Sequence, residues 1–370
     1  MTGSLALVLV ILIGFSNAKK VKDNDDKLIA VALMFRHGDR TIITTYPNDP
    51  YKDLKYWPEG FGQLTNDGKK RHYHLGKWIR KRYSAFLDTH YKPKEIYVKS
   101  TDVDRALMSA ESNLAGLYKP RGRDVWKNDL DWQPIPIHGV PQSLDNIISM
   151  KKKCPKYEKM YDDFMVGPEM NAVKKKYQKY FDIANENSGM EFENVKQFEK
   201  IHGVLNIELS KGYDIPKWTK AIFPIYTEKL SGIAYSTGSY NQNLARLKDG
   251  PFFYFLTSHF NRILNQNCTE NKEGPSCQKL LMLSAHDKTV GNILTALGVY
   301  DLLPPPFCAT VIFELRNPQQ PYVNILYKKD DDLKKLKLKD CKYNCPWEKF
   351  LQLTEQITLN NTQWEEECKL

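Results

Sequence analysis

The chain has 370 residues, of which 41% are hydrophobic and 12% aromatic, so it is long enough to bury a large core. This composition excludes disordered and collagen-like chains. The formal net charge is +10 at pH 7, mostly from lysine. The lysines are dispersed, and no basic stretch is interleaved with aromatic residues as in a nucleic-acid-binding module, so we expect no nucleic-acid partner. A basic surface of this kind keeps a protein soluble and attracts anionic substrates.

The N-terminal residues indicate export. Residues 5–15 form an apolar run that is too short to span a bilayer comfortably, and residues 16–18 (Ser-Asn-Ala) place small side chains where signal peptidase cleaves. We therefore expect a signal peptide over residues 1–18 and a secreted, extracellular mature protein. An uncleaved anchor is the alternative, because no Lys or Arg precedes the apolar run. No second stretch approaches the length of a membrane span, so no membrane partner is expected.

Cysteine usage agrees with export. The chain has seven cysteines: Cys154, Cys268, Cys277, Cys308, Cys341, Cys345 and Cys368. Because this number is odd, an oxidising compartment would leave at least one thiol unpaired. The close spacings 268/277 and 341/345 favour short local loops. Two sequons begin at Asn267 and Asn360, which we take as predicted glycosylation sites.

The two ends of the chain have the pattern of an α/β protein. Residues 28–35 form a continuous apolar run, typical of a strand buried on both faces. Thr65 is the predicted N-cap of a helix that runs to about Arg82, residues 95–99 form a short strand, and residues 100–102 (Ser-Thr-Asp) are expected to cap the next helix. A second apolar strand over 280–285 precedes a helix that runs to about Leu297. Strands over 309–315 and 322–327 follow.

The middle of the chain has a different texture. From residue 151 to 262, charged and apolar residues mix at helical spacing and few runs resemble strands. We predict an α/β fold with a mostly parallel sheet flanked by helices and a smaller inserted α-helical domain. The α/β domain would span residues 24–150 plus 263–370, and the inserted helical domain residues 151–262.

The first candidate site lies where the first buried strand ends, at Arg36, His37 and Arg40. Ligands of open α/β sheets bind at the carboxyl ends of the strands. Two guanidinium groups beside one imidazole suit a phosphate dianion, because arginine stays charged and its planar fork matches phosphate oxygens. Gly38 would let the backbone turn and approach the anion. The alternative is that these are surface arginines with an incidental histidine.

Two further segments carry candidates. His286 and Asp287 follow the strand over 280–285, where a carboxylic acid can protonate a leaving alkoxide and a histidine can hold a phosphate oxygen. The alternative is a helix-capping Asp beside a packed histidine. Arg105, early in its helix, is a weaker candidate by itself. His286, Asp287 and Arg105 all follow strands of one α/β scaffold, and this shared position strengthens the case for each as a site residue.

Five stretches together resemble the histidine acid phosphatase family, in particular its prostatic and lysosomal branch and similar secreted venom and salivary phosphatases of insects: FRHGDRT, WPEGFGQLTNDG, STDVDRALMSA, WQPIPIHGVP and LSAHDKTVGNILTALGVYDLLPP. The resemblance runs from about residue 28 to 368. It implies that His37 is the nucleophile that becomes phosphorylated and that Asp287 is the proton donor. It also implies that Arg36, Arg40, Arg105 and His286 hold the phosphate of a monoester substrate.

The same resemblance implies several further features. Cys154 would pair with Cys368 and Cys341 with Cys345, Cys268 and Cys277 would close their own loop, and Cys308 would be a buried free thiol because its family partner is missing here. A homodimer is implied. No cofactor and no metal are expected, and the chemistry requires none.

The chain departs from the family pattern at two positions. Ile42 stands in place of a proline, and Lys288 in place of the threonine that usually follows the HD pair, so the pKa of Asp287 or the substrate preference could differ. Three alternative functions remain open: a phytase-like phosphatase, a phosphoglycerate mutase-like transferase, which export and cysteine usage disfavour, and a secreted phospholigand-binding protein without turnover.

Overall fold

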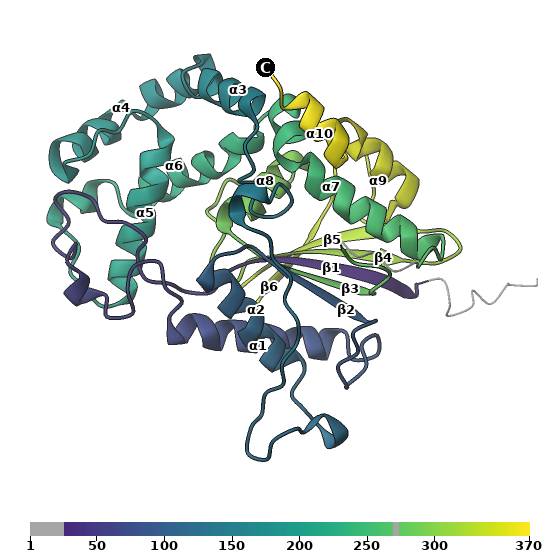
Figure 1. Ribbon diagram of the computed structural model, residues 1–370. Coiled ribbons are helices and arrows are strands. Elements are labelled where there is room, and N and C mark those ends of the chain that lie inside the picture. The colour runs from purple at the N-terminus through teal and green to yellow at the C-terminus, as the bar shows by residue number, and fades with distance from the viewer. Residues whose placement is uncertain (1–25, 269–273) are drawn as a thin grey trace, which may run out of the picture.

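The computed structural model describes residues 26–268 and 274–370, and Figure 1 traces the chain from its purple N-terminal strand to the yellow C-terminal helix. The predicted signal peptide over residues 1–18 lies outside the described residues. The described chain contains these strands: β1 (Leu28–Arg36), β2 (Ile96–Ser100), β3 (Leu280–Ala285), β4 (Thr310–Arg316), β5 (Tyr322–Lys329), β6 (Asp332–Leu336) and β7 (Cys345–Pro346). Its helices are α1 (Asn66–Arg82), α2 (Asp104–Leu117), α3 (Pro155–Met165), α4 (Pro168–Ser188), α5 (Val195–Ser210), α6 (Ile225–Ser236), α7 (Gln242–Leu264), α8 (Asp287–Ala296), α9 (Trp347–Thr354) and α10 (Asn361–Glu367).

One sheet forms the centre of the molecule, with the strand order β2-β3-β1-β4-β5-β6 and β7 paired to β5. The three strands β2, β3 and β1 are parallel, whereas β4, β5, β6 and β7 add to the sheet by antiparallel pairing. β1 and β3 are almost entirely buried, as their unbroken apolar runs predict. The predicted α/β class with helices flanking a central sheet is confirmed.

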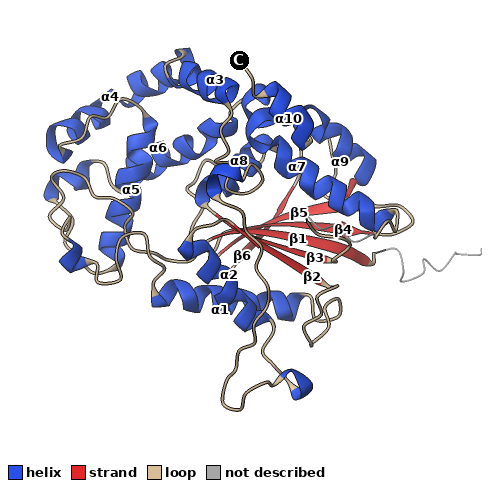
Figure 2. Ribbon diagram, viewed as in Figure 1, coloured by secondary structure: helices blue, strands red, loops and turns tan. Residues whose placement is uncertain are grey.

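Helices cover both faces of the sheet, as Figure 2 shows. On one face α1 and α2 bury side chains such as Leu75, Ile79 and Leu114 against the strands. On the other face α7, α8 and α9 bury residues such as Phe260 and Phe350. Each layer thus hides one apolar face of the sheet, which accounts for the burial of the central strands on both sides.

The helix starts follow the predicted capping at one position and not at another. Thr65 is the N-cap of α1, and its hydroxyl accepts a hydrogen bond from the Gly68 N–H, as expected. The prediction that residues 100–102 cap α2 is wrong, because Val103 occupies the N-cap and no side chain caps that helix. The hydroxyl of Thr101 instead faces His286 across the sheet edge.

A second group of helices, α3 to α6, lies beside the sheet rather than on it (Figure 1). Its core is built around residues such as Phe181 and Phe198 and also takes in Ile42 and Trp57 from the segment after β1. α7 belongs by its packing to the sheet, although the predicted insertion extended to residue 262. The division of the chain into domains at 151 and 262 stays a prediction.

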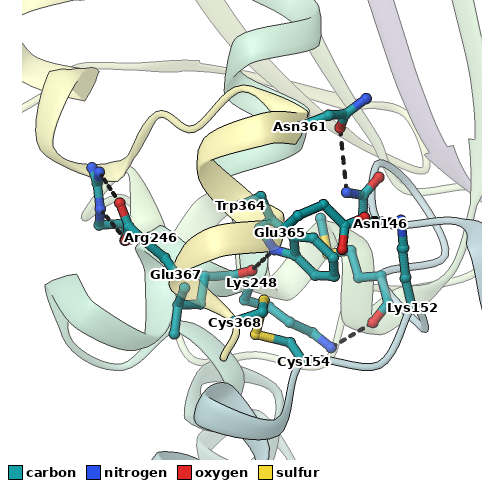
Figure 3. Close-up of a disulfide and its surroundings, with 12 residues drawn as sticks. Asn146, Lys152, Cys154, Arg246, Lys248, Asn361, Trp364, Glu365, Glu367 and Cys368 are labelled. Atoms are coloured by element: carbon teal, nitrogen blue, oxygen red, sulfur yellow. Dashed lines mark hydrogen bonds and ion pairs between the residues drawn. A yellow bond between two sulfur atoms is a disulfide. The ribbon is translucent and has the colours of Figure 1, made fainter. Parts of the chain in front are cut away.

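Three disulfides restrain the structure: Cys154–Cys368, Cys268–Cys277 and Cys341–Cys345. Figure 3 shows the first, which joins the start of α3 to the end of α10, beside Trp364. The Trp364 indole N–H donates to the Leu247 carbonyl, so α10 is also held against α7. Cys308 is a free, half-buried thiol. Disulfides of this number are typical of an oxidising compartment.

The predicted glycosylation sites both lie at or near the surface. Asn267 is exposed, and Asn360 is the N-cap of α10, where its side-chain oxygen accepts from the Gln363 N–H. Glycosylation at both stays a prediction. Among residues 26–268 and 274–370, no helix combines the length and the apolar character that crossing a membrane requires.

Candidate active site

The register of the parallel strands brings the predicted site residues together. Arg36 pairs with Ala285, and Ser100 pairs with Ser284, so β1, β3 and β2 end at the same edge of the sheet. The segments after these strands carry all six of the predicted site residues: Arg36, His37, Arg40, Arg105, His286 and Asp287. Positions far apart in the sequence therefore meet because parallel strands present their carboxyl ends at one edge.

His37 is buried, with 1% of its surface exposed, and its ring orientation is defined by its neighbours. Its Nδ1 lies 2.8 Å from the Gly38 carbonyl oxygen, which can only accept, so the proton sits on Nδ1 and Nε2 carries a free lone pair. Burial lowers the pKa of His37 well below its usual value, and Arg36, Arg40, His286 and Arg105 lower it further. His37 is therefore a neutral imidazole with an unprotonated Nε2.

The three arginines retain donors for a ligand. The Nε groups of Arg36, Arg40 and Arg105 are buried and meet no hydrogen-bond acceptor within the described parts of the chain. Burial lowers the pKa of Arg40 to about 10 and also lowers that of Arg105, so both remain charged at acidic and neutral pH. Buried guanidinium donors without acceptors are costly, and an oxyanion with several lone pairs would satisfy them.

Asp287 lies within this group of positive charges. Its Oδ2 is 2.9 Å from Arg36 Nη2, and the side chain is 14% exposed. Burial by itself would raise its pKa, but Arg36, His37, Arg40 and His286 together hold the pKa well below its usual value. The carboxyl group is consequently ionised in the free enzyme.

His286 lies next to both of these groups. Its ring centroid is 5.6 Å from that of His37, and its Nε2 lies 3.0 Å from the Thr101 hydroxyl. Burial first, and then the charge of Arg105, lower its pKa to about 4. Thr101 was not identified as a site residue from the sequence, although its place directly after β2 could have indicated it.

Arg36 is held by two residues that sequence reasoning also missed. Its Nη1 donates to the Pro305 carbonyl at 2.5 Å, and its guanidinium carbon lies 4.1 Å from the centre of the Phe307 ring. These contacts leave Nε for a ligand and Nη2 for Asp287. Pro305 ends the family-like stretch that begins at residue 283, but nothing in that stretch marks it as a partner of Arg36, and Phe307 lies just beyond it.

Gly38 serves a purpose other than the predicted turn. Its backbone conformation is not left-handed, but a Cβ there would lie 2.5 Å from the Gly68 carbonyl oxygen. The segment after β1 thus packs directly on the start of α1, and the Gly38 N–H donates to the Ser109 hydroxyl of α2. Behind it, the buried ring of His72 donates from Nε2 to the Arg36 carbonyl, and burial lowers the pKa of His72 to about 3.

The six residues open into a cavity of about 1090 Å³ between the sheet edge and the helices α3, α5, α6 and α7. The cavity is far larger than a phosphate group needs, so it has room for the rest of a substrate. Lys288, one of the two departures from the family pattern, lines this cavity and pairs with Glu199 of α5 at 3.2 Å. In the chain as described, no group of three or more His, Cys, Asp and Glu side chains is placed to bind a metal ion.

Comparison with known proteins agrees with this geometry. The histidine phosphatase superfamily (branch 2) matches residues 19–328. Human lysosomal acid phosphatase is 33% identical over 99% of this chain and 86% of its own length, and human prostatic acid phosphatase is 34% identical over 99% and 93%. The chain belongs to the histidine phosphatase superfamily, branch 2. The predicted family resemblance is therefore confirmed.

Solved structures of phytases share the fold at low sequence identity. A phytase of Hafnia alvei in complex with tartrate superposes with a TM-score of 0.69 over 94% of this chain and 99% of its own, at 16% identity. A phytase of Klebsiella sp. ASR1 gives a TM-score of 0.65 over 90% and 96%, at 13% identity. Likeness at this level of identity concerns the fold alone.

Proposed function

We propose that this protein is an acid phosphatase that hydrolyses phosphate monoesters through a phosphohistidine formed on His37. The observation that supports this most directly is the state of His37, which is neutral and protonated on Nδ1, with its Nε2 lone pair free beside three arginines. A neutral imidazole with its second nitrogen held by a carbonyl is an activated nucleophile. The kinship with acid phosphatases supports the same activity.

In the first step Nε2 of His37 forms a bond to phosphorus as the bond from phosphorus to the ester oxygen breaks. Arg36, Arg40, Arg105 and His286 hold the phosphoryl oxygens, which positions the group for in-line attack and offsets its charge. The proton of His37 stays on Nδ1, where it is donated to the Gly38 carbonyl, so the phosphorylated ring carries a positive charge that favours the second step.

Asp287 protonates the departing alcohol oxygen. In the free enzyme its carboxyl group is ionised, because the arginines keep the pKa of Asp287 low, so the proton must come from elsewhere. The substrate can supply it. A phosphate monoester takes up its second proton at a pH of about 6, and the bound anion offsets the arginine charges and so raises the pKa of Asp287. This proton source predicts higher activity in acid, where the substrate carries its second proton.

In the second step water attacks the phosphohistidine, and Asp287 accepts a proton from that water. The bond from phosphorus to Nε2 breaks, inorganic phosphate leaves, and His37 returns to its neutral form. No metal takes part in either step, because the arginines supply the positive charge that phosphoryl transfer requires.

The test is to trap the intermediate. Enzyme mixed with a labelled monoester at pH 5 and quenched in acid should retain phosphate that is stable in alkali and labile in acid, as a phosphoramidate is. His37→Ala should carry none and should lose hydrolysis of p-nitrophenyl phosphate, while wild-type activity should survive chelation with EDTA. An alkali-labile phosphate, or complete loss of activity with EDTA, would contradict the scheme.

Secretion, cleavage of the signal peptide after Ala18, glycosylation and a homodimer complete the proposal. Three disulfides support an oxidising environment for the mature protein. The phytase-like alternative has weaker support, because the phytases resemble this chain in fold at 13–17% identity, whereas the acid phosphatases match it at about 33%.

A further inference from the structure

The wall of the cavity beyond the phosphate-binding residues is unusually rich in lysine. Besides Lys200 of α5, four lysine side chains line the cavity near the place where α3, α5, α7 and α8 converge: Lys151, Lys196, Lys248 and Lys288. None of these is required by the two steps on His37. We call these four residues the lysine wall.

Two ammonium groups of the lysine wall rest on aromatic rings rather than on carboxylates. Lys196 Nζ lies 4.3 Å from the centre of the Tyr161 ring, and Lys248 Nζ lies 4.9 Å from that of Tyr157. The two tyrosines are one turn apart on α3, with ring centroids 5.8 Å apart and nearly parallel planes. Lys248 also donates to the Met150 carbonyl at 2.7 Å and lies beside the Cys154–Cys368 disulfide (Figure 3). These contacts fix the positions of both ammonium groups.

The positive charge of the lysine wall is only partly neutralised. Glu199 is paired with Lys288, and within residues 26–268 and 274–370 no carboxylate forms an ion pair with Lys151, Lys196 or Lys248. Burial lowers the pKa of Lys248 to about 8; the charge of Asp249 opposes this effect, and the charges of Lys288 and Lys151 add to it. Burial also lowers the pKa of Lys196; the charge of Asp162 opposes this effect and that of Lys288 adds to it. Repulsion among the lysine ammonium groups is unfavourable in the free enzyme, and a bound anion would relieve it.

We propose that the lysine wall binds a second phosphate group, carried by the leaving alcohol, so that the preferred substrates are bisphosphorylated compounds. This inference rests on the proposed function and specifies its substrate class. The phosphate beside His37 is transferred, and the second phosphate stays bonded to the released alcohol. A phosphate group fits better than a carboxylate, because its three acceptor oxygens and its charge of up to −2 can serve several ammonium groups of the lysine wall at once.

The proposal can be tested with alkanediol phosphates of increasing chain length. For each length, kcat/KM is measured at pH 5 for the monophosphate and for the bisphosphate, and their ratio is compared. A discrete subsite predicts that the ratio peaks at one chain length, where the second phosphate reaches the lysine wall. A general positive field would instead change the ratio smoothly with length, and that result would overturn the proposal.

Charge-removing variants then assign the effect to residues. At the best chain length, Lys196→Met should lower the bisphosphate-to-monophosphate ratio roughly five- to fiftyfold, the range expected for losing a partly desolvated charged contact. Lys288→Met provides a second, independent variant with the same expected direction. Lys179→Met is the matched control, since Lys179 is an exposed residue of α4 that does not line the cavity, and it should leave the ratio unchanged. An unchanged ratio in Lys196→Met and Lys288→Met would overturn the proposal.

Calorimetry separates this proposal from the proposed function. His37→Ala is titrated with the bisphosphate and with the monophosphate, and no turnover is needed. Tighter binding of the bisphosphate that disappears when Lys196→Met is added would support the lysine wall even if the wild-type enzyme hydrolysed neither compound. Equal binding of the two compounds would overturn it even if both were hydrolysed.

Discussion

Two buried carboxyl groups of this protein lie in opposite electrostatic surroundings. Asp287 at the sheet edge faces Arg36 and the other cations of the site, and its pKa is held well below its usual value. Glu208 of α5 faces Asp49, from the segment after β1, and burial together with that neighbour raises the pKa of Glu208 to about 9. Both side chains are removed from water, so burial alone cannot explain the difference. The charges within reach decide which carboxyl group is ionised.

Within residues 26–268 and 274–370 neither Asp49 nor Glu208 forms an ion pair, although the charge of Lys52 acts weakly on Asp49. Asp49 Oδ1 accepts from the Tyr51 N–H at 2.7 Å, but no donor in the described parts of the chain reaches its Oδ2 or either carboxylate oxygen of Glu208. A proton shared between the two carboxyl groups satisfies one oxygen of each, as for two acids in one site. The pair links α5 to the segment after β1. Its protonation therefore supports the contact between the sheet and the neighbouring helices.

The largest expected effect concerns the ionised member, Asp287. Asp287→Asn retains the size of the side chain but cannot deliver a proton, and a general acid contributes roughly 10²–10⁴ in rate. Cleavage of glycerol phosphate, which expels a strongly basic alkoxide, should fall by most of that factor. Release of p-nitrophenolate, a good leaving group, should fall much less in pre-steady-state burst measurements. Equal losses on both substrates would mean that Asp287 serves binding rather than proton transfer.

Arg36→Met would make the surroundings of Asp287 more like those of Glu208. Arg36 is the cation that lowers the pKa of Asp287 most, so its removal should raise that pKa and move the acidic limb of the pH–rate profile to higher pH. The lost contact with the phosphoryl group should cost roughly 10²–10³ in kcat. Arg121→Met, at an exposed loop position away from the cavity, is the control. A rate loss with an unshifted acidic limb would show that Arg36 does not set the pKa of Asp287.

Glu208→Gln tests the protonated member through stability. Because the pKa of Glu208 is raised on folding, its stabilising contribution is complete below about pH 4.5 and is lost as pH rises toward about 9. The Tm of the wild type should therefore fall between pH 7 and 9 relative to that of Glu208→Gln, by at least about 2 °C. This window lies above the pKa of unfolded histidine, and the comparison with the variant cancels the other groups. Glu193→Gln, at an exposed position, is the control, and its Tm should change with pH as that of the wild type does. If the Tm of Glu208→Gln changes in the same way, the shared proton is refuted.

The smallest effect is expected at Cys308, which is close to the cation-rich site but protonated. Burial raises its pKa to about 12, despite the opposing charge of Arg71. Because the thiolate is the reactive form, iodoacetamide at pH 7 should leave the native enzyme unmodified and active. After denaturation without reductant, alkylation should appear at Cys308 alone on peptide mapping. Modification of Cys308 in the native state would mean that the nearby cations outweigh burial.

Much of the fold could be predicted from local patterns. The unbroken apolar run that became β1, the capping threonine of α1 and the strand before His286 all depend on neighbouring residues, so a short window contains their signal. β6 was missed because its sequence, Asp-Leu-Lys-Lys-Leu, is mostly polar and exposed, and it forms a strand by pairing with β5. The cap of α2 was wrong because Thr101 has a partner across the sheet, which no local pattern reveals.

The sequence by itself determined which chemistry was available: arginines, a histidine and an acid at the ends of apolar strands, in an order that matches a known family. The tertiary structure alone decided the state of those groups. Parallel register brought the strand ends together, the Gly38 carbonyl selected the tautomer of His37, and surrounding cations ionised Asp287 while their absence left Glu208 protonated. The physical reason is that a motif specifies residue type and spacing along the chain. Protonation and orientation instead depend on burial and on charges that only folding brings within a few ångströms.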